Sequence, residues 1–245
     1  MTRQLDGILF DFGDTLVDFA HVDVLARFED GARSVYQYLK DLNQPMPAFN
    51  KYHRQQLWAV RWRYFMSYFT GRDFNALDLI DHLGDALGHD LSAEQLAELV
   101  FRWYTPMREH GTMEPGIPDM LAGLRDRGLK LGVISNTFIP ASVLDQHLES
   151  IGLIDLFPVR IYSCELDFRK PDKRIFQLGL DELGTAPERT MYVGNSLRCD
   201  IGGSNRMGMI SVLKHLDRRR RGLFIKPKHP IEKLMDLPAI VEQYL

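Results

Sequence analysis

Five short apolar runs lie along the chain, at about residues 5–12, 129–134, 158–163, 190–194 and 209–213. Helical patterns at about 117–127, 141–151, 172–184 and 198–207 alternate with them. A short apolar run is typical of a strand that is buried on both faces. Strands that alternate with helices predict a parallel sheet covered by helices on both sides. We therefore predict an α/β fold with a doubly wound, mostly parallel, Rossmann-like sheet.

The segment between the first and second apolar runs follows a different pattern. Helical periodicity appears near residues 22–42, 48–70, 75–88 and 93–105, without a strong strand signal. Ser92 and Gln95 have the spacing of a capping box that opens the last of these helices. We predict an inserted α-helical domain over residues 18–113. The core domain then consists of residues 1–17 and 114–245.

Four aromatic residues share one face of the second predicted helix. They are Trp58, Trp62, Phe65 and Phe69. Such a stripe lines either an aromatic substrate pocket or the core of a helical bundle. Because apolar stripes at helical spacing usually form a buried face, we expect the bundle core.

The first apolar run ends in a group of polar residues. Asp11 follows the run Ile8–Phe10, and Gly13, Asp14 and Thr15 come next. The carboxyl ends of parallel strands meet at one edge of the sheet, where ligands bind. A carboxylate in such a place is costly unless a cation or a chemical task meets it. Asp11 is therefore our candidate for a nucleophile.

Three later segments also place polar residues after an apolar run. They are 131–136, ending in Ser135 and Asn136; 169–172, with Lys170; and 191–200, with Asn195 and Asp200. In this order the four segments resemble the four sequence motifs of the haloacid dehalogenase (HAD) superfamily. The resemblance covers nearly the whole chain outside the helical segment. A single short motif is weak evidence, but four in order are specific.

The resemblance implies a role for each of these residues. In phosphatases of this superfamily the residue that matches Asp11 attacks phosphorus. Ser135, Asn136 and Lys170 would bind the phosphorylated substrate, with Lys170 neutralising negative charge. The Mg²⁺ ligands would be Asp11, the Gly13 carbonyl, Asn195 and Asp200. The resemblance also implies that the helical insertion is a cap that closes over the site and sets specificity.

Two motif positions depart from the family pattern. Gly13 stands where the family usually has an aspartate that acts as general acid and base. The adjacent Asp14 is either a turn-forming residue or a substitute for that aspartate, and both interpretations stay open. Asn195 stands where family phosphatases commonly have a metal-binding aspartate. Because Asn brings no charge, we expect weaker Mg²⁺ binding.

These departures leave three functional hypotheses. The first is a Mg²⁺-dependent phosphatase that acts on a small phosphorylated metabolite through an aspartyl-phosphate intermediate. A missing general acid costs such an enzyme about 10²–10⁴ in rate without abolishing it. The second is a 2-haloacid dehalogenase, in which the same Asp attacks carbon without a metal. The third is a catalytically weak ligand-binding member of the family.

The composition limits the partners that we expect. The 245 residues carry a net charge of −3 and are 45% hydrophobic, which gives no reason to expect nucleic acid or membrane binding. The start of the chain leaves no room for a signal peptide, and the two cysteines, Cys164 and Cys199, favour a reducing compartment. We therefore expect a cytoplasmic monomer or homodimer. Arg218–Arg221 forms either a solvated surface or a contact with an anionic ligand, and we favour the surface.

Overall fold

The computed structural model of the chain describes residues 5–215 and 225–245. The basic run Arg218–Arg221 lies outside the described residues, so its role stays a prediction.

The described residues form one parallel sheet in the order β3-β2-β1-β4-β5-β6. The strands are β1 (Gly7–Phe10), β2 (Lys130–Ser135), β3 (Val159–Tyr162), β4 (Thr190–Gly194), β5 (Ile210–Lys214) and β6 (His229–Ile231). β1 lies between β2 and β4, and Gly7 is in register with both Lys130 and Thr190. The predicted α/β fold is confirmed. β6 was not predicted, because a run of three residues that contains proline carries little strand signal.

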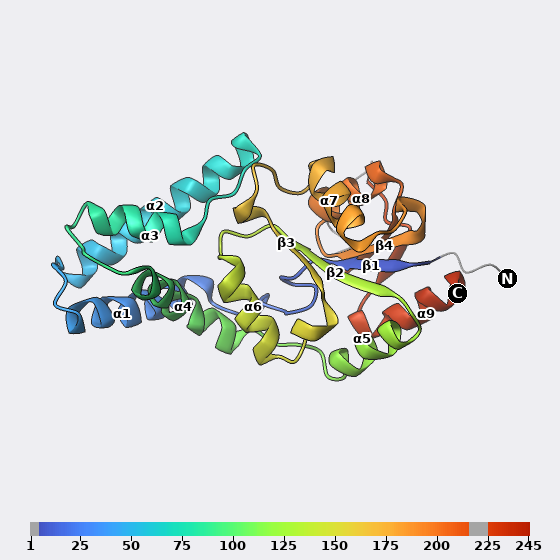
Figure 1. Ribbon diagram of the computed structural model, residues 1–245, viewed down its shortest axis with the longest axis horizontal. Helices are drawn as coiled ribbons and strands as arrows, with labels where there is room; N and C mark the ends of the chain where they lie inside the picture. The colour runs from blue at the N-terminus through green and yellow to red at the C-terminus, as the bar shows by residue number, and fades with distance from the viewer. Residues whose placement is uncertain (1–4, 216–224) are drawn as a thin grey trace.

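Helices cover both faces of the sheet (Figure 1). α7 (Lys173–Leu183) and α8 (Gly202–Met207) lie on one face; α5 (Ile117–Asp126), α6 (Ala141–Ser150) and α9 (Leu237–Val241) lie on the other. Short helical turns occur at Ile154–Leu156, Ser163–Glu165, Pro187–Arg189, Leu197–Ile201, Leu234–Asp236 and Glu242–Tyr244. α7 approaches the sheet closely at Gly179, where a Cβ would lie 2.6 Å from Ile134 and 3.1 Å from Leu9.

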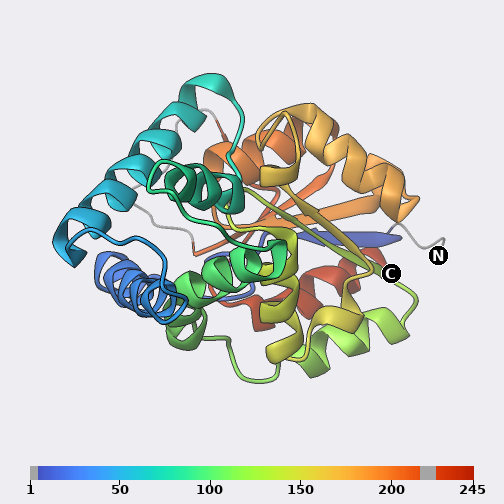
Figure 2. The ribbon, with the colours of Figure 1, turned by 60° about the vertical axis from the view of Figure 1, so that its left-hand side comes forward.

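The remaining helices form a bundle beyond the carboxyl ends of the strands (Figures 1 and 2), which we call the cap after the predicted domain. They are α1 (Val24–Asp41), α2 (Phe49–Thr70), α3 (Ala76–Asp85) and α4 (Ala93–His110). The chain enters and leaves the cap through Asp18 and Thr112, whose backbones form two hydrogen bonds of 2.7 and 3.1 Å. The two connections therefore lie side by side. Residues 18–113 remain our proposed extent of the cap.

α4 agrees with the predicted start and extends past the predicted end. Ser92 and Gln95 form the expected capping box, with reciprocal hydrogen bonds of 2.8 and 3.3 Å. The helix continues through Pro106 to His110, although proline lacks the N–H that a helix interior needs. Trp103 and Met107, on either side of the proline, are buried, and this packing offsets the lost hydrogen bond.

The prediction for the aromatic stripe of α2 was wrong. Trp58, Trp62, Phe65 and Phe69 are 67%, 50%, 52% and 72% exposed. The helix buries a different face, which contains Tyr52, Gln56, Val60 and Ser67. Periodicity shows which residues share a face, but α2 has apolar residues on both faces and the pattern does not say which one packs inward.

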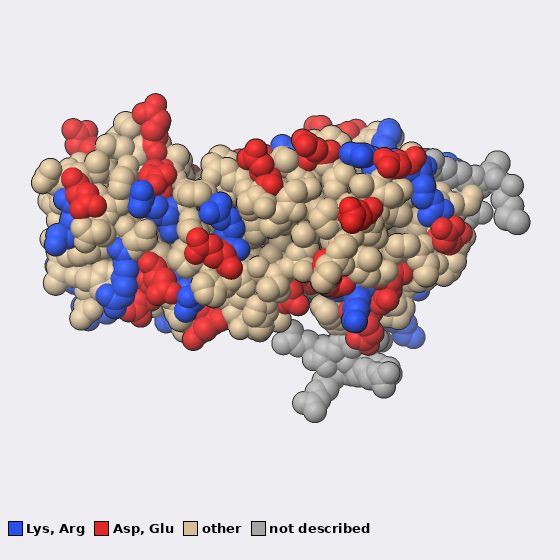
Figure 3. All heavy atoms as spheres, turned by 90° about the horizontal axis from the view of Figure 1, so that it is seen from below, with Lys and Arg blue, Asp and Glu red and all other residues tan. Residues whose placement is uncertain are grey.

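The surface carries interspersed charges on the face shown in Figure 3, where acidic and basic side chains alternate over both cap and core. Within residues 5–215 and 225–245, every helix is too short or too polar to cross a membrane.

Candidate active site

The residues predicted from the four motifs meet at the carboxyl edge of the sheet. Asp11 follows β1, Ser135 ends β2, Lys170 follows β3, and Asp200 lies in the helical turn after β4. They are between 1% and 8% exposed. The central position of β1, flanked by β2 and β4, is the crossover point at which doubly wound sheets bind ligands.

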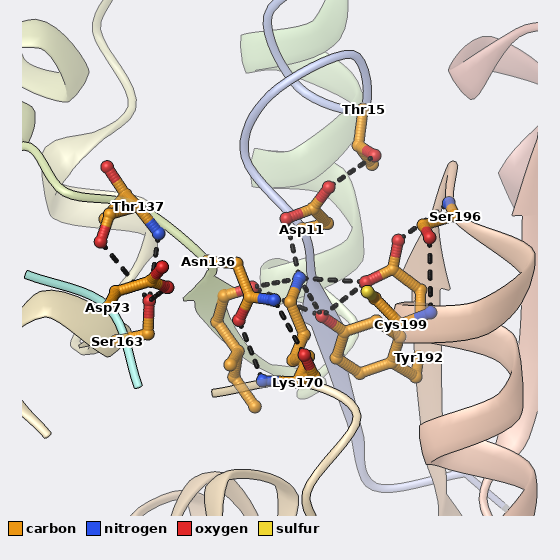
Figure 4. Close-up of polar contacts among 12 residues, drawn as sticks. Asp11, Thr15, Asp73, Asn136, Thr137, Ser163, Lys170, Tyr192, Ser196 and Cys199 are labelled. Carbon is orange, nitrogen blue, oxygen red and sulfur yellow. Dashed lines mark hydrogen bonds and ion pairs between the residues drawn. The ribbon is translucent and has the colours of Figure 1, made fainter. Parts of the chain in front are cut away.

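The Lys170 ammonium lies at the centre of this cluster (Figure 4). Its Nζ is 2.7 Å from Asp11 Oδ1 and 2.8 Å from Asp200 Oδ1. It also donates to the Ile134 carbonyl at 2.8 Å and to the Tyr192 hydroxyl at 2.9 Å. One ammonium group is therefore shared by two buried carboxylates and held by two neutral oxygens.

Burial and charge act in opposite directions on these groups. Burial raises the pKa of Asp11 to about 6; Lys170 opposes this rise and the nearby Asp200 adds to it. Burial disfavours the charged form of Lys170, but the two carboxylates together raise its pKa well above the ordinary value. Lys170 is therefore charged at neutral pH, and Asp11 is mostly ionised there, which is the form that the predicted nucleophile requires.

Asn136 has a supporting position. Its side-chain amide donates to the Lys170 carbonyl and accepts from the Lys170 N–H, both at 2.8 Å. The amide thus fixes the backbone from which the ammonium extends. Asn136 also lines the cavity above the cluster, so substrate contact stays a prediction.

The turn after β4 holds Asp200 in place. The Ser196 N–H donates to Asp200 Oδ2 at 2.8 Å. Gly194 makes this packing possible, because a Cβ there would come 2.4 Å from the Asp200 carboxyl carbon. Asn195 lies between these residues and lines the cavity.

Gly13 and Asp14 have different environments. Asp14 adopts a left-handed backbone conformation, with φ of 57°, and its Oδ1 accepts the Phe19 N–H at 2.8 Å. Its carboxylate therefore stabilises the loop that leads to the cap, which favours the turn-forming role. Gly13 lines the cavity, and a Cβ there would meet nothing closer than Phe19 at 3.9 Å. The site thus has room for a side chain at the position of the missing acid.

The cluster forms the floor of a cavity of about 340 Å³ between core and cap. The wall above it is aromatic and apolar; it includes Phe19, Tyr64, Tyr68, Tyr104 and Met107. The Tyr104 hydroxyl is hydrogen-bonded to Nδ1 of His147 at 2.9 Å. Burial lowers the pKa of His147 to about 4, so this pair is neutral at physiological pH.

A second buried ion pair, which the sequence did not reveal, joins cap and core beside the cavity. Arg169 Nη1 lies 2.6 Å from Oδ1 of Asp73, in the segment after α2. The other Asp73 oxygen accepts from the Ser163 hydroxyl, which in turn accepts the Thr137 N–H at 2.9 Å (Figure 4). Asp73 therefore contacts two residues that follow β3, and Ser163 links it to the loop that follows β2. Asp73 and Arg169 are 96 positions apart, so no local pattern points to the pair.

Tyr192 is the other site residue that the sequence did not reveal. It lies inside β4, and its hydroxyl is 2.9 Å from Lys170 Nζ and 3.4 Å from Asp200 Oδ1. Within an apolar strand a tyrosine is indistinguishable from a core aromatic residue.

The cluster is compatible with a hard cation. Two carboxylates share one ammonium group, which leaves net negative charge in a buried place. Among the described residues no group of three or more acidic, histidine or cysteine side chains meets at one point. A metal would therefore be held by Asp11 and Asp200 together with neutral oxygens, of which Gly13 and Asn195 line the same cavity.

Fold and site together define an α/β protein with a helical cap and a buried Asp-Lys-Asp cluster at the sheet edge. The family model for haloacid dehalogenase-like hydrolases matches residues 5–208. The chain belongs to this family, as the four motifs indicated.

The chain spans about half the length of the curated relatives that it matches. The chain is 30% identical over 138 residues to the glyceraldehyde 3-phosphate phosphatase of Methanopyrus kandleri, which covers 56% of each protein. It is 31% identical over 128 residues to the phosphoglycolate phosphatase of Escherichia coli K12, which covers 50% of each.

Solved structures match over the whole chain. A HAD phosphatase from Thermococcus onnurineus is 23% identical with a TM-score of 0.66, covering 97% of this chain and 98% of that one. A 2-haloacid dehalogenase from Pseudomonas syringae is 20% identical with a TM-score of 0.67, covering 98% and 100%. At these identities the likeness shows the fold alone.

We expect Asp73→Asn to destabilise the protein by about 3 kcal/mol, because it leaves the largely buried Arg169 guanidinium without its partner. Urea unfolding measures the loss. Asp167→Asn is the matched control, since it breaks another ion pair between cap and core, Arg72–Asp167, that is 3.6 Å long and exposed. The control should change stability by less than about 1 kcal/mol. Equal effects of both variants would show that the Asp73 pair does not hold the cap.

Asp11→Asn should raise the melting temperature at alkaline pH. Because the pKa of Asp11 is about 6 in the folded chain against 3.8 ordinarily, its protonated form favours folding, and this contribution is lost as pH rises through 6. The neutral Asn should melt several degrees higher than wild type above about pH 7 and no higher near about pH 4. Asp172→Asn is the control of opposite sign, because a hydrogen bond from Arg174 lowers the pKa of Asp172. Identical melting curves for Asp11→Asn and wild type across this range would contradict the burial effect.

Proposed function

We propose that the protein is a Mg²⁺-dependent phosphatase that acts on a small phosphorylated metabolite through an aspartyl-phosphate on Asp11. The observation that carries this proposal is the Lys170 ammonium shared by Asp11 and Asp200 at the floor of the cavity. The phosphatase names of the curated relatives support the choice of phosphorus over carbon.

Each residue at the floor of the cavity has a separate role in the proposed reaction. An Asp11 carboxylate oxygen forms the bond to phosphorus, and the alcohol oxygen of the substrate leaves. The Ser135 hydroxyl, buried at the end of β2, donates a hydrogen bond to a phosphoryl oxygen. Lys170 balances the negative charge that gathers around the Asp11 carboxylate. Water then attacks the phosphorus of the aspartyl-phosphate, which releases phosphate and restores Asp11.

Charge balance favours a divalent cation. Asp11, Asp200 and Lys170 carry a net charge of −1, and a phosphate dianion brings it to −3 in a largely buried place. Arg169, the other cation that lines the cavity, is already paired with Asp73. Mg²⁺ bound by Asp11, Asp200, the Gly13 carbonyl and Asn195 would neutralise charge on the phosphoryl oxygens.

A 2-haloacid dehalogenase is the second candidate, and the specific observation that favours it is the absence of an acid at Gly13. Halide leaves without a proton, so attack of Asp11 on carbon needs no such group. Asn195 also favours this alternative, because it lacks the negative charge of the metal-binding aspartate that family phosphatases commonly have at this position. A ligand-binding member with little catalysis is the third possibility. A small-molecule substrate and a cytoplasmic location remain predictions in all three cases.

A screen of small phosphorylated metabolites with and without Mg²⁺ tests the proposal. We expect phosphate release that requires Mg²⁺ and is absent in Asp11→Asn. Asn195→Asp adds a third carboxylate and should lower the Mg²⁺ concentration that gives half-maximal activity. Asn50→Asp adds the same charge on the exposed surface of α2 and should leave that concentration unchanged. Halide release from 2-haloacids without a metal, in place of phosphate release, would favour the dehalogenase. Ligand-induced stabilisation without any turnover would favour the third possibility.

The dependence of the reaction rate on the leaving group tests whether the site lacks an acid at Gly13. Without an acid to protonate the departing oxygen, an aryl phosphate with a leaving-group pKa of about 7 should react up to about 10²–10⁴-fold faster than an alkyl phosphate. Gly13→Asp combined with Asp14→Gly restores the family arrangement and should raise the alkyl rate. The structure accommodates both changes, because Gly13 has free space and Asp14 has a positive φ.

Asp14→Asn provides the comparison, because Asn tolerates the same backbone conformation. If Asp14 is the acid, wild type will hydrolyse the aryl and alkyl phosphates at similar rates, and Asp14→Asn will lower only the rate for the alkyl phosphate. Similar wild-type rates that do not depend on Asp14 would show that another residue supplies the proton.

A further inference from the structure

The exposed aromatic stripe of α2 lies opposite the buried side of the helix, and none of its four residues lines the cavity. Tyr64 and Tyr68 of the same helix line the cavity. Trp58 and Trp62 stack in parallel with ring centroids 6.1 Å apart, and the rings of Phe65 and Phe69 lie 4.9 Å apart. The stripe is therefore an ordered surface that the catalytic floor does not use. Contiguous exposed apolar surfaces of this kind mark interaction sites.

A groove runs beside the stripe, between α2 and α3, which lie side by side in Figures 1 and 2. Its volume is about 500 Å³. The lining is largely apolar and includes Tyr52, Trp58, Ala59, Leu83, Ala86 and Leu87. Trp58 belongs to both the groove and the stripe, so the two form one continuous surface.

The charges on these two helices are of opposite sign. α2 contains no acidic residue, and the exposed Arg54 and Arg61 lie four and three positions from Trp58 on the same side of the helix. α3 exposes Asp78, Asp81 and Asp85, whose spacing of three and four places them on one face. A basic aromatic helix thus lies beside an acidic one.

We propose that this surface pairs with the same surface of a second copy of the chain, so that the protein is a two-fold symmetric dimer through its caps. A two-fold interface must be complementary to itself, since each copy presents the same patch. Here the basic, aromatic α2 of one copy meets the acidic α3 of the other, twice. The groove of each copy receives aromatic side chains from its partner.

The exposed area agrees with this pairing. Large aromatic side chains bury about 150–250 Å² each, so four rings that are 50–72% exposed offer about 500 Å². A stable interface buries about 800 Å² per partner, and the groove and flanking charges supply the remainder. An anionic membrane fits less well, because Asp78, Asp81 and Asp85 would repel it.

Sedimentation equilibrium of the full chain between about 1 and 100 µM tests the proposal. Wild type should have twice the mass of one chain. Trp62→Glu combined with Phe65→Glu should weaken the dimer at least about 100-fold, as the loss of two central anchors does. Leu25→Glu, at a 53% exposed position of α1, is the matched control and should remain dimeric. Circular dichroism verifies that each variant is folded.

Charge reversal distinguishes this interface from any other. Arg54→Glu with Arg61→Glu should give a monomer, and so should Asp78→Lys with Asp85→Lys, because each variant places like charges opposite each other twice. Mixing the two variants should restore a dimer, since both contacts then join opposite charges. A monomeric wild type would overturn the proposal. So would a dimer that survives the aromatic changes, or two variants that stay monomeric when mixed.

Discussion

A single ammonium group shared by two buried carboxylates is the interaction on which the site depends. Lys170 lies within 2.8 Å of both Asp11 and Asp200. The three residues follow different strands, so the parallel sheet must bring β1, β3 and β4 to one edge before the contact can form. Removing the ammonium would be strongly destabilising, because two buried carboxylates would then have no compensating charge. The neutral oxygens of Tyr192 and Ile134 complete the coordination of the ammonium.

The cap is connected to this centre through the residue next to Lys170. Arg169 binds Asp73 of the cap, while Lys170 binds the carboxylates of Asp11 and Asp200. The position of the cap is therefore linked to the loop that carries the ammonium. α2 adds a second connection, because one side of it lines the cavity with Tyr64 and Tyr68 while another side carries the proposed dimer surface. Dimerisation through that surface would leave the cavity free for substrate.

The sheet and the convergence of Asp11, Ser135, Lys170 and Asp200 were predictable, because apolar strands and the polar residues at their ends are local signals. Other features depend on contacts between distant residues and leave no local pattern. Asp73 meets Arg169 across the cap–core boundary, and Tyr192 looks like an ordinary strand residue. The burial of α2 was mispredicted because both of its faces carry apolar side chains. The environment of Asp14 was open for a related reason, since the direction of a turn side chain depends on the backbone that follows it.

Carbon-13 NMR of the aspartate carboxyl groups, recorded without metal across the acidic and neutral range, tests the central claim most directly. The resonance that disappears in Asp11→Asn identifies the group. In wild type it should titrate with a pKa of about 6. In Lys170→Met its pKa should be higher, because the ammonium that stabilises the ionised form is gone. A resonance that titrates near the ordinary value of 3.8 in both proteins would contradict the account.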